Sequence, residues 1–70
     1  MFLAWFDDNP KKTTGIKIAE AIAAYMARFQ VRPTVVLVNA ADLVEVPGVT
    51  IRAVGYVRAN TFWVGQEGDA

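Results

Sequence analysis

Three aspartates follow apolar segments that are typical of buried strands. Asp7 and Asp8 come directly after the apolar segment 2–6, and Asp42 comes shortly after the valine-rich segment 34–38. If these segments are parallel strands, their carboxyl ends lie at the same edge of a sheet, where open α/β sheets bind ligands. Clustered carboxylates can hold Mg²⁺ and position a phosphoryl group. One hypothesis is therefore a Mg²⁺-dependent phosphoryl-transfer enzyme, such as a nuclease. The alternative is that Asp7 and Asp8 belong to an ordinary turn.

Basic and hydroxyl side chains precede the segment that is expected to form a helix. A helix N-terminus presents unpaired backbone N–H groups that favour anions, and nearby lysines add positive charge. This pattern predicts a site for a phosphate-bearing ligand, although it also fits a solvated loop with a threonine helix cap. The candidate anion-binding residues are Lys11, Lys12, Thr13 and Thr14.

Aromatic and basic side chains alternate near the C-terminal end. Aromatic rings can stack on bases while arginines neutralise phosphates. A nucleic-acid-binding accessory protein is therefore a further hypothesis, but seven basic and seven acidic residues cancel and disfavour nucleic acid as a partner. The alternative is that the aromatic residues lie in the core. The residues in question are Arg52, Tyr56, Arg58, Asn60 and Trp63.

The chain contains no cysteine, histidine or serine. This composition excludes disulfides, Cys/His zinc sites and the usual nucleophile–base pairs of covalent catalysis. We therefore expect a protein that works by binding and not by catalysis, with no cofactor. Mg²⁺ enters only in the phosphoryl-transfer alternative.

The residue pattern predicts one helix and about four strands. Segments 2–6, 34–38, 49–57 and 61–65 are expected strands, and 15–29 is an expected helix with Thr13 or Thr14 as its N-cap. Residues 58–60 are expected to join the last two strands as a hairpin, with Asn60 in the left-handed conformation and Gly55 at a bulge. The prediction is an α/β (α+β) fold of one domain, 1–70, in the order β-α-β-β-β. It has a mixed sheet and a frayed tail at 66–70.

The expected helix carries an apolar stripe on one side and small residues on the other. Ile18, Ile22, Tyr25, Met26 and Phe29 recur at helical spacing and predict the buried face. The opposite face is expected to hold Lys17, Ala21 and further alanines, exposed to solvent. Alanine favours helix formation here, and the alternative is that these small residues admit a second helix.

The two segments 2–6 and 34–38 are apolar on both faces, which predicts central strands running parallel to each other. A single helix covers only one face of the sheet, and a domain of 70 residues needs an additional source of stability. We therefore expect self-association, most simply as a two-fold homodimer. The alternative is that Trp63, Tyr56 and the loop 39–48 fold over this face. The candidate interface residues are Leu3, Trp5, Val36, Val38 and Trp63.

The apolar segment at residues 1–6 is too short to span a membrane or to form the core of a signal peptide. We therefore expect a cytoplasmic protein without a membrane partner.

Overall fold

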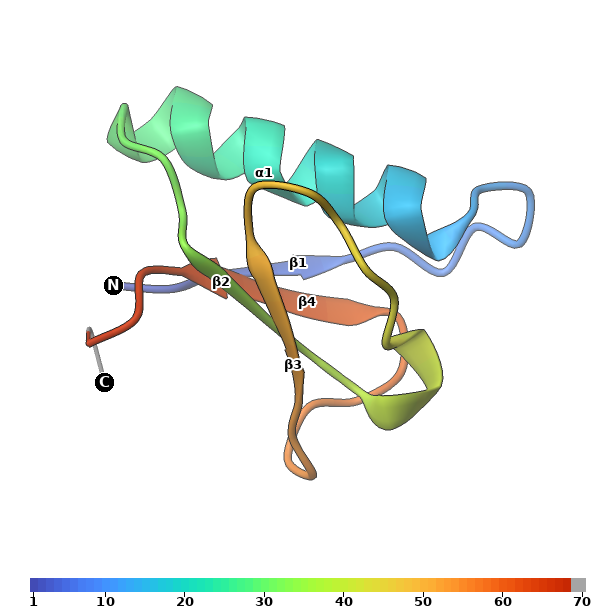
Figure 1. Ribbon diagram of the computed structural model, residues 1–70. Coiled ribbons are helices and arrows are strands. Elements are labelled where there is room, and N and C mark those ends of the chain that lie inside the picture. The colour runs from blue at the N-terminus through green and yellow to red at the C-terminus, as the bar shows by residue number, and fades with distance from the viewer. Residues whose placement is uncertain (69–70) are drawn as a thin grey trace.

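The computed structural model describes residues 1–68, in which four strands form one mixed sheet and a long helix packs against it (Figure 1). This arrangement confirms the predicted α/β (α+β) class and the order β-α-β-β-β. The elements are β1 Leu3–Phe6, α1 Thr14–Phe29, β2 Val35–Val38, the short 3₁₀ helix η1 Ala40–Asp42, β3 Thr50–Ala53 and β4 Thr61–Gly65.

Both ends of α1 are fixed by local hydrogen bonds. The Thr13 hydroxyl accepts a hydrogen bond from the Ile16 N–H at 3.2 Å, which makes Thr13 the N-cap, one of the two predicted. At the other end Gln30 adopts the left-handed conformation with φ 59°, and its N–H donates to the Met26 carbonyl. Pro33 follows and prevents continuation of the helix. Sequence-local signals therefore set the length of α1.

The strand order in the sheet is β1-β4-β2-β3. β4 pairs antiparallel with both β1 and β2, so β1 and β2 run parallel to each other, as predicted, with β4 between them. β3 pairs parallel with β2 at the opposite edge. The predicted hairpin between 49–57 and 61–65 is therefore wrong. β3 ends at Ala53, and the segment 54–60, which contains Gly55 in a turn instead of a bulge, crosses the end of β2 to reach the middle of the sheet.

Burial explains which strand takes the central position. Phe62 and Val64 of β4 are fully buried, whereas Thr50 and Arg52 of β3 are exposed. A β3–β4 hairpin at the edge of the sheet would leave the apolar side of β4 with neighbours on one side only. The central position of β4 lets strands on both sides contribute to the burial of Phe62 and Val64.

The prediction of a central strand at 2–6 is wrong, because β1 lies at an edge of the sheet. Its residues alternate in burial: Leu3 and Trp5 are half-buried, while Ala4 and Phe6 are exposed. Apolar residues on both faces are therefore compatible with an edge strand here, since only one face packs against the core.

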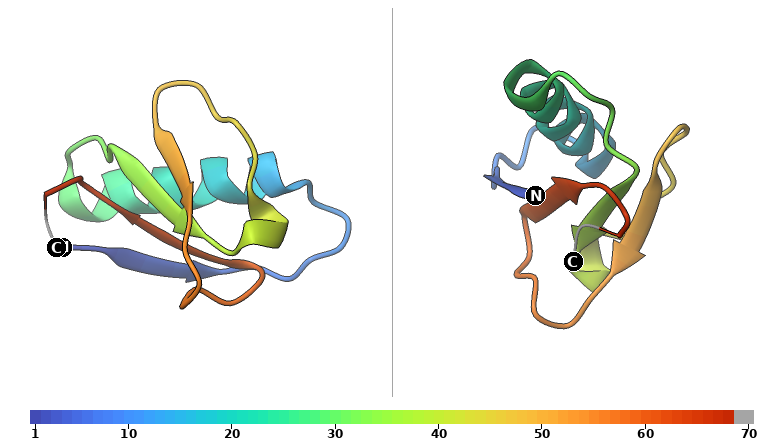
Figure 2. Two further views of the ribbon diagram at one scale, coloured as in Figure 1. Left: turned by 60° about the horizontal axis from the view of Figure 1, so that its bottom comes forward. Right: turned by 90° about the vertical axis from the view of Figure 1, so that its left-hand side faces the viewer.

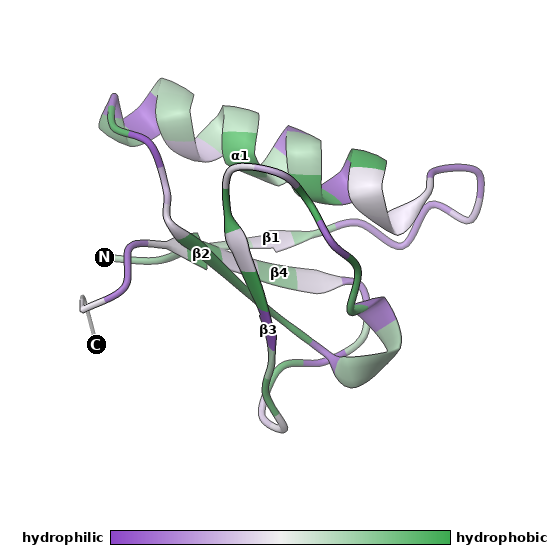
Figure 3. Cartoon of the chain, viewed as in Figure 1, coloured by the Kyte–Doolittle hydropathy of each residue, from purple (hydrophilic) through white to green (hydrophobic). Residues whose placement is uncertain are grey.

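The core lies between α1 and one face of the sheet. Figure 2 shows α1 lying over one face of the sheet. Ile18, Ala21 and Tyr25 of α1 are buried against residues from the two central strands. The exposed position expected for Ala21 is wrong, because this residue is 0% exposed and its small side chain lets α1 approach the sheet closely. Figure 3 shows the hydrophobic β2 in contrast to the hydrophilic loop that precedes α1. The sheet residues of the core are Val36, Val38, Phe62 and Val64.

The segment after β4 is tied to the chain before β2. The Gln66 side chain donates a hydrogen bond to the Arg32 carbonyl at 3.0 Å, and the Glu67 N–H donates to the Thr34 hydroxyl at 2.7 Å. Residues 66 and 67 are therefore attached to the fold, in contrast to the frayed tail expected at 66–70. Residues 69 and 70 lie outside the described residues. Within residues 1–68, no helix has the length and apolar character needed to cross a membrane.

Candidate functional site

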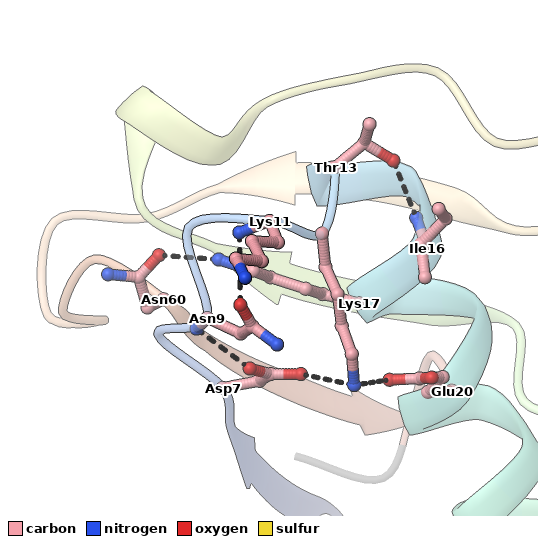
Figure 4. A network of polar contacts seen from close by, with 9 residues as sticks. Asp7, Asn9, Lys11, Thr13, Ile16, Lys17, Glu20 and Asn60 are labelled. Carbon is pink, nitrogen blue, oxygen red and sulfur yellow. Dashed lines mark hydrogen bonds and ion pairs between the residues drawn. The ribbon is translucent and has the colours of Figure 1, made fainter.

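A network of charged and polar side chains lies where β1 ends and α1 begins (Figure 4). The Lys12 ammonium donates a hydrogen bond to Glu20 at 2.8 Å and contacts Asp7 at 3.3 Å. Asp7 also accepts a hydrogen bond from the Asn9 N–H at 2.9 Å. This bond, with the neighbouring Lys12, lowers the pKa of Asp7 from its ordinary value. The hydrogen bonds to Glu20 and Asp7 raise the pKa of Lys12. Lys12 is thus held between two carboxylates.

Asn60 links three elements of this network. Its backbone N–H donates to the Asp42 carboxylate at 2.8 Å, its carbonyl accepts from the Asp7 N–H at 3.0 Å, and its side-chain oxygen accepts from Lys17 at 3.2 Å. Asn60 has φ 65°, which confirms the predicted left-handed conformation. The exposed position expected for Lys17 is wrong, since this residue is only 6% exposed. Asn60 therefore joins the end of β1, the first turn of α1 and η1.

The expected anion-binding residues are largely engaged within the chain. Lys12 is paired with two carboxylates, and the Thr13 hydroxyl caps α1. Lys11 remains exposed, and Thr14 is the first residue of α1. The structure therefore does not assemble these four residues around a common point with free donors. The local sequence predicted the helix cap correctly but could not show that Lys12 turns toward Asp7 and Glu20.

The three aspartates of the metal hypothesis are likewise not assembled. Asp8 is exposed, whereas Asp7 and Asp42 each accept hydrogen bonds from different backbone N–H groups. In residues 1–68, no group of three or more acidic side chains lies close enough together to hold a metal ion. Asp7 and Asp42 serve instead as internal hydrogen-bond acceptors.

The candidate interface residues fall on two different faces of the sheet. Val36 and Val38 are fully buried, and Leu3 and Trp5 pack against the same core beneath α1. Their assignment to an uncovered face is therefore wrong. The reason is the strand register, because Trp63 lies opposite Ala4 and Leu37 and so points to the other face.

Trp5 shows an additional feature on the buried face. Its indole N–H is buried and has no hydrogen-bond acceptor among the described residues. Burial of an unpaired donor costs free energy, so Trp5 is held in place by packing and not by a polar contact.

The face of the sheet opposite α1 carries an exposed aromatic cluster. Phe6 is 65% exposed, Tyr56 is 72% exposed and Trp63 is 38% exposed. The Tyr56 and Trp63 rings meet edge to face, with centroids 6.5 Å apart. In the part of the chain that the structure describes, no helix or strand covers this face (Figure 2). We call the set Ala4, Phe6, Leu37, Tyr56 and Trp63 the open-face patch.

One end of the same face is closed by Phe2. Its ring lies against Gly65, where an added Cβ atom would be 2.5 Å from Phe2 Cδ2. Beside this ring is a hollow of about 220 Å³ that is lined in part by Val35, Leu37 and Tyr56. Arg52 at the rim of the hollow forms an ion pair with Glu67 at 3.6 Å. Phe2 and the segment after β4 thus narrow the open face without covering the patch.

A larger open hollow of about 880 Å³ lies beside β3, under the loop that leads into this strand. Its lining is mostly apolar, and Glu45 is the single charged residue in it. Val44, Val46 and Val49 from this loop pack against the core on the α1 side. The alternative expectation that the loop 39–48 covers the open face is therefore wrong.

The sequence did not identify Phe6, Lys17 and the open-face role of Leu37. A signal for Lys17 was present, because Lys17, Ala21 and Tyr25 recur at intervals of one helical turn and share a face. Phe6 shares a strand face with Ala4, but only the partner strand decides whether that face is covered.

Comparison of the chain with protein-family models, curated proteins and solved structures finds no significant match.

Proposed function

We propose that the protein is a non-enzymatic binding module that self-associates through the open-face patch. The observation that carries this proposal is the exposure of Phe6, Tyr56 and Trp63 together on a sheet face that no described helix or strand covers. Contiguous apolar surface of this kind marks interaction sites on folded proteins. Aromatic side chains are also the residues that contribute most to association in protein interfaces.

The polar network supports binding over catalysis. Lys12 is paired with Asp7 and Glu20, and the buried Lys17 donates to Asn60. These groups hold the ends of the elements together, and each ammonium donates to an acceptor inside the chain. A catalytic site needs side chains that can contact a substrate, whereas the side chains of this network bond to one another.

The size of the chain supports a second copy as the partner. A domain of 70 residues gains limited stability from one core, and here the core is formed on a single face of the sheet. A second copy that covered part of the open-face patch would add burial without any new element of the chain. We therefore favour a homodimer over a larger assembly, since two-fold pairs are the commonest symmetric oligomers.

The experiment is sedimentation equilibrium of the full chain across micromolar to millimolar concentrations. We expect dimer mass to increase with concentration, and Phe6→Thr should weaken the dimer. Ile16→Thr is the matched control, because Ile16 is also exposed, at 49%, but lies on α1 away from the patch. Monomer mass at every concentration would overturn the proposal. An equal effect of both substitutions would also overturn it.

The nucleic-acid hypothesis depends on part of the same patch. Tyr56 and Trp63 could stack on bases, but Arg52 is paired with Glu67, and Arg58 is an exposed residue in the same segment as Tyr56. We therefore expect no salt-dependent binding of single-stranded oligonucleotides. Binding that weakens steeply with salt and is lost in Arg58→Ala would favour nucleic acid over self-association.

A further inference from the structure

The outer edge of β1 offers unpaired backbone groups to a partner strand. The Asp7 N–H donates to the Asn60 carbonyl, so Asp7 and Asn60 form a hydrogen-bonded pair at the end of the β1–β4 ladder. Because such pairs alternate with non-hydrogen-bonded pairs, Leu3 and Trp5 also bond to β4. The N–H and C=O groups of Ala4 and Phe6 therefore point away from the sheet.

This edge lacks the features that usually protect edge strands. Residues 2–6 contain no charged residue and no proline, and all of them are apolar. The other edge strand, β3, exposes Thr50 and the charged Arg52, and the loop that precedes it lines a hollow together with β3. β1 is thus the edge at which strand addition is least hindered.

We propose that a second copy of this chain pairs with it antiparallel, β1 to β1, so that the two sheets become continuous. The inference rests on the proposed self-association and specifies its geometry. The two-fold axis passes beside Trp5, and Ala4 of each copy lies opposite Phe6 of the other. Each of these two pairs exchanges hydrogen bonds in both directions, since Ala4 and Phe6 present their backbone groups outward.

The side chains favour this register. Phe6 is large and 65% exposed, and it would lie over the small Ala4 of the second copy, next to Trp63. A shift by two residues would place Ala4 opposite Ala4 and would set Phe6 against Phe2, whose ring already covers Gly65. The Ala4–Phe6 register therefore fills the space beside Trp63, whereas the shifted register leaves it open.

The charges favour the antiparallel direction. At the strand rise of about 3.4 Å per residue, the two Asp7 residues of an antiparallel pair centred on Trp5 would lie about 14 Å apart. A parallel pair in register would bring them to about 4.8 Å. Charges separated by more than about 10 Å are largely screened at 0.1 M salt, so only the parallel arrangement carries strong repulsion between Asp7 and Asp8 of the two copies.

The available area requires a contribution from the backbone. At about 200 Å² per aromatic side chain, the exposed parts of Phe6, Tyr56 and Trp63 amount to roughly 350 Å². A standard interface buries about 800 Å² per partner. Contact through these rings alone is therefore small for a stable dimer, and the hydrogen bonds of the β1 edge supply interactions that a face-to-face contact lacks.

Amide hydrogen exchange of the full chain, measured by NMR at low and high protein concentration, tests this geometry directly. The Leu3 and Trp5 amides bond to β4 and should be protected at both concentrations. The Ala4 and Phe6 amides should exchange rapidly in dilute solution and become protected as the dimer forms. Dimer mass without protection at Ala4 and Phe6 would overturn the inference while leaving the proposed self-association in place.

Two variants separate the edge from the face. Ala4→Pro removes an outward N–H without breaking the β1–β4 ladder, because proline is tolerated at such edge positions. It should weaken the dimer about tenfold or more, as expected for the loss of a hydrogen bond from each copy. Tyr56→Ser removes a ring of the open-face patch that lies outside the β1 joint, so it should weaken the dimer less than Ala4→Pro does. Loss of the dimer in Tyr56→Ser but not in Ala4→Pro would show face-to-face association, and a monomeric parent chain would overturn both proposals.

Discussion

The contact between Gly65 and Phe2 can be tested with the substitution Gly65→Ala. An alanine Cβ atom at this position would lie 2.5 Å from Phe2 Cδ2 and 2.7 Å from Cε2 and Cγ. These distances are too short for van der Waals contact, so the Phe2 ring must leave the surface of β4. The backbone of Gly65 does not have the positive φ that restricts alanine, in contrast to Gly48 and Gly68. The clash with the ring is therefore the reason to expect a loss of stability.

The size of the loss follows from how deeply the ring is buried. Burial of a whole phenylalanine side chain stabilises a protein by about 1.5–3 kcal/mol, and Phe2 is half-buried. We therefore expect Gly65→Ala to lower the free energy of unfolding by about 1–2 kcal/mol, within the range measured for overpacked sites. In a domain of this size, 1 kcal/mol shifts the melting temperature by about 4–8 °C. The expected fall in Tm is thus about 5–15 °C.

The assay is thermal unfolding followed by circular dichroism for the parent chain, Gly65→Ala, Phe2→Ala and the double variant, all at one protein concentration. Phe2→Ala removes the ring, so the added methyl group has nothing to displace. In that background Gly65→Ala should be neutral or slightly stabilising, since alanine restricts the unfolded chain more than glycine does. An equal loss of Tm in both backgrounds would refute the reasoning, because the cost would then not come from the ring.

Four further predictions concern the polar network and the core. Asn60→Gly keeps the left-handed backbone but removes the acceptor of the buried Lys17, so urea unfolding should show a free energy of unfolding that is lower by about 1–3 kcal/mol. Asn60→Ala should lower it by about 1 kcal/mol more, because alanine is strained in the left-handed conformation. A Gly variant as stable as the parent would contradict the role of the Lys17–Asn60 hydrogen bond. Ile18→Ala should cost about 2–5 kcal/mol, which approaches the whole stability of the domain, and a cooperative melt close to that of the parent would contradict the core assignment. The pKa of Asp7 is lowered in the folded chain, so its contribution to stability is present above the ordinary value of 3.8 and is lost as pH falls through the lowered value. Asp7→Asn should therefore flatten the acid side of the Tm–pH curve. An unchanged slope would count against the network. The pKa of Lys12 is raised, so its contribution is present below 10.5 and is lost as pH rises through the raised value, which alkaline melts of Lys12→Met should no longer show.

The local elements could be predicted because their signals are local. The Thr13 cap, the apolar stripe of α1 and the left-handed Asn60 each depend on a few neighbouring residues. The strand order could not be predicted in the same way. β4 pairs with both β1 and β2 because its apolar residues gain most from neighbours on both sides. This requires a comparison between strands, which the pattern of a single strand does not provide.

The sequence pattern also could not predict which face of each strand is buried. Residues 2–6 and 35–38 are apolar at every position, so alternation could not decide between Leu3 and Ala4, or between Val36 and Leu37. The structure decides through Phe62 and Val64, which face α1 and take Leu3, Trp5 and Val36 with them by register. The candidate site failed for a similar reason. The number of carboxylates was apparent from the sequence, but their partners come from other parts of the fold. Lys12, in the loop before α1, pairs with Asp7, and the Asn60 N–H donates to Asp42.

The central position of β4 has a consequence for the order of events in folding. In the described chain β1 pairs with β4 alone, so Leu3 has no ladder partner until Val64 is available. A chain still under synthesis at residue 60 can form α1 and pair β2 with β3, but it cannot close the sheet, and its apolar segment 2–6 stays unpaired. Contacts between such distant parts of a sequence slow folding. We therefore expect a late and cooperative folding step, with exposed strand-forming segments as targets for chaperones until the last strand inserts.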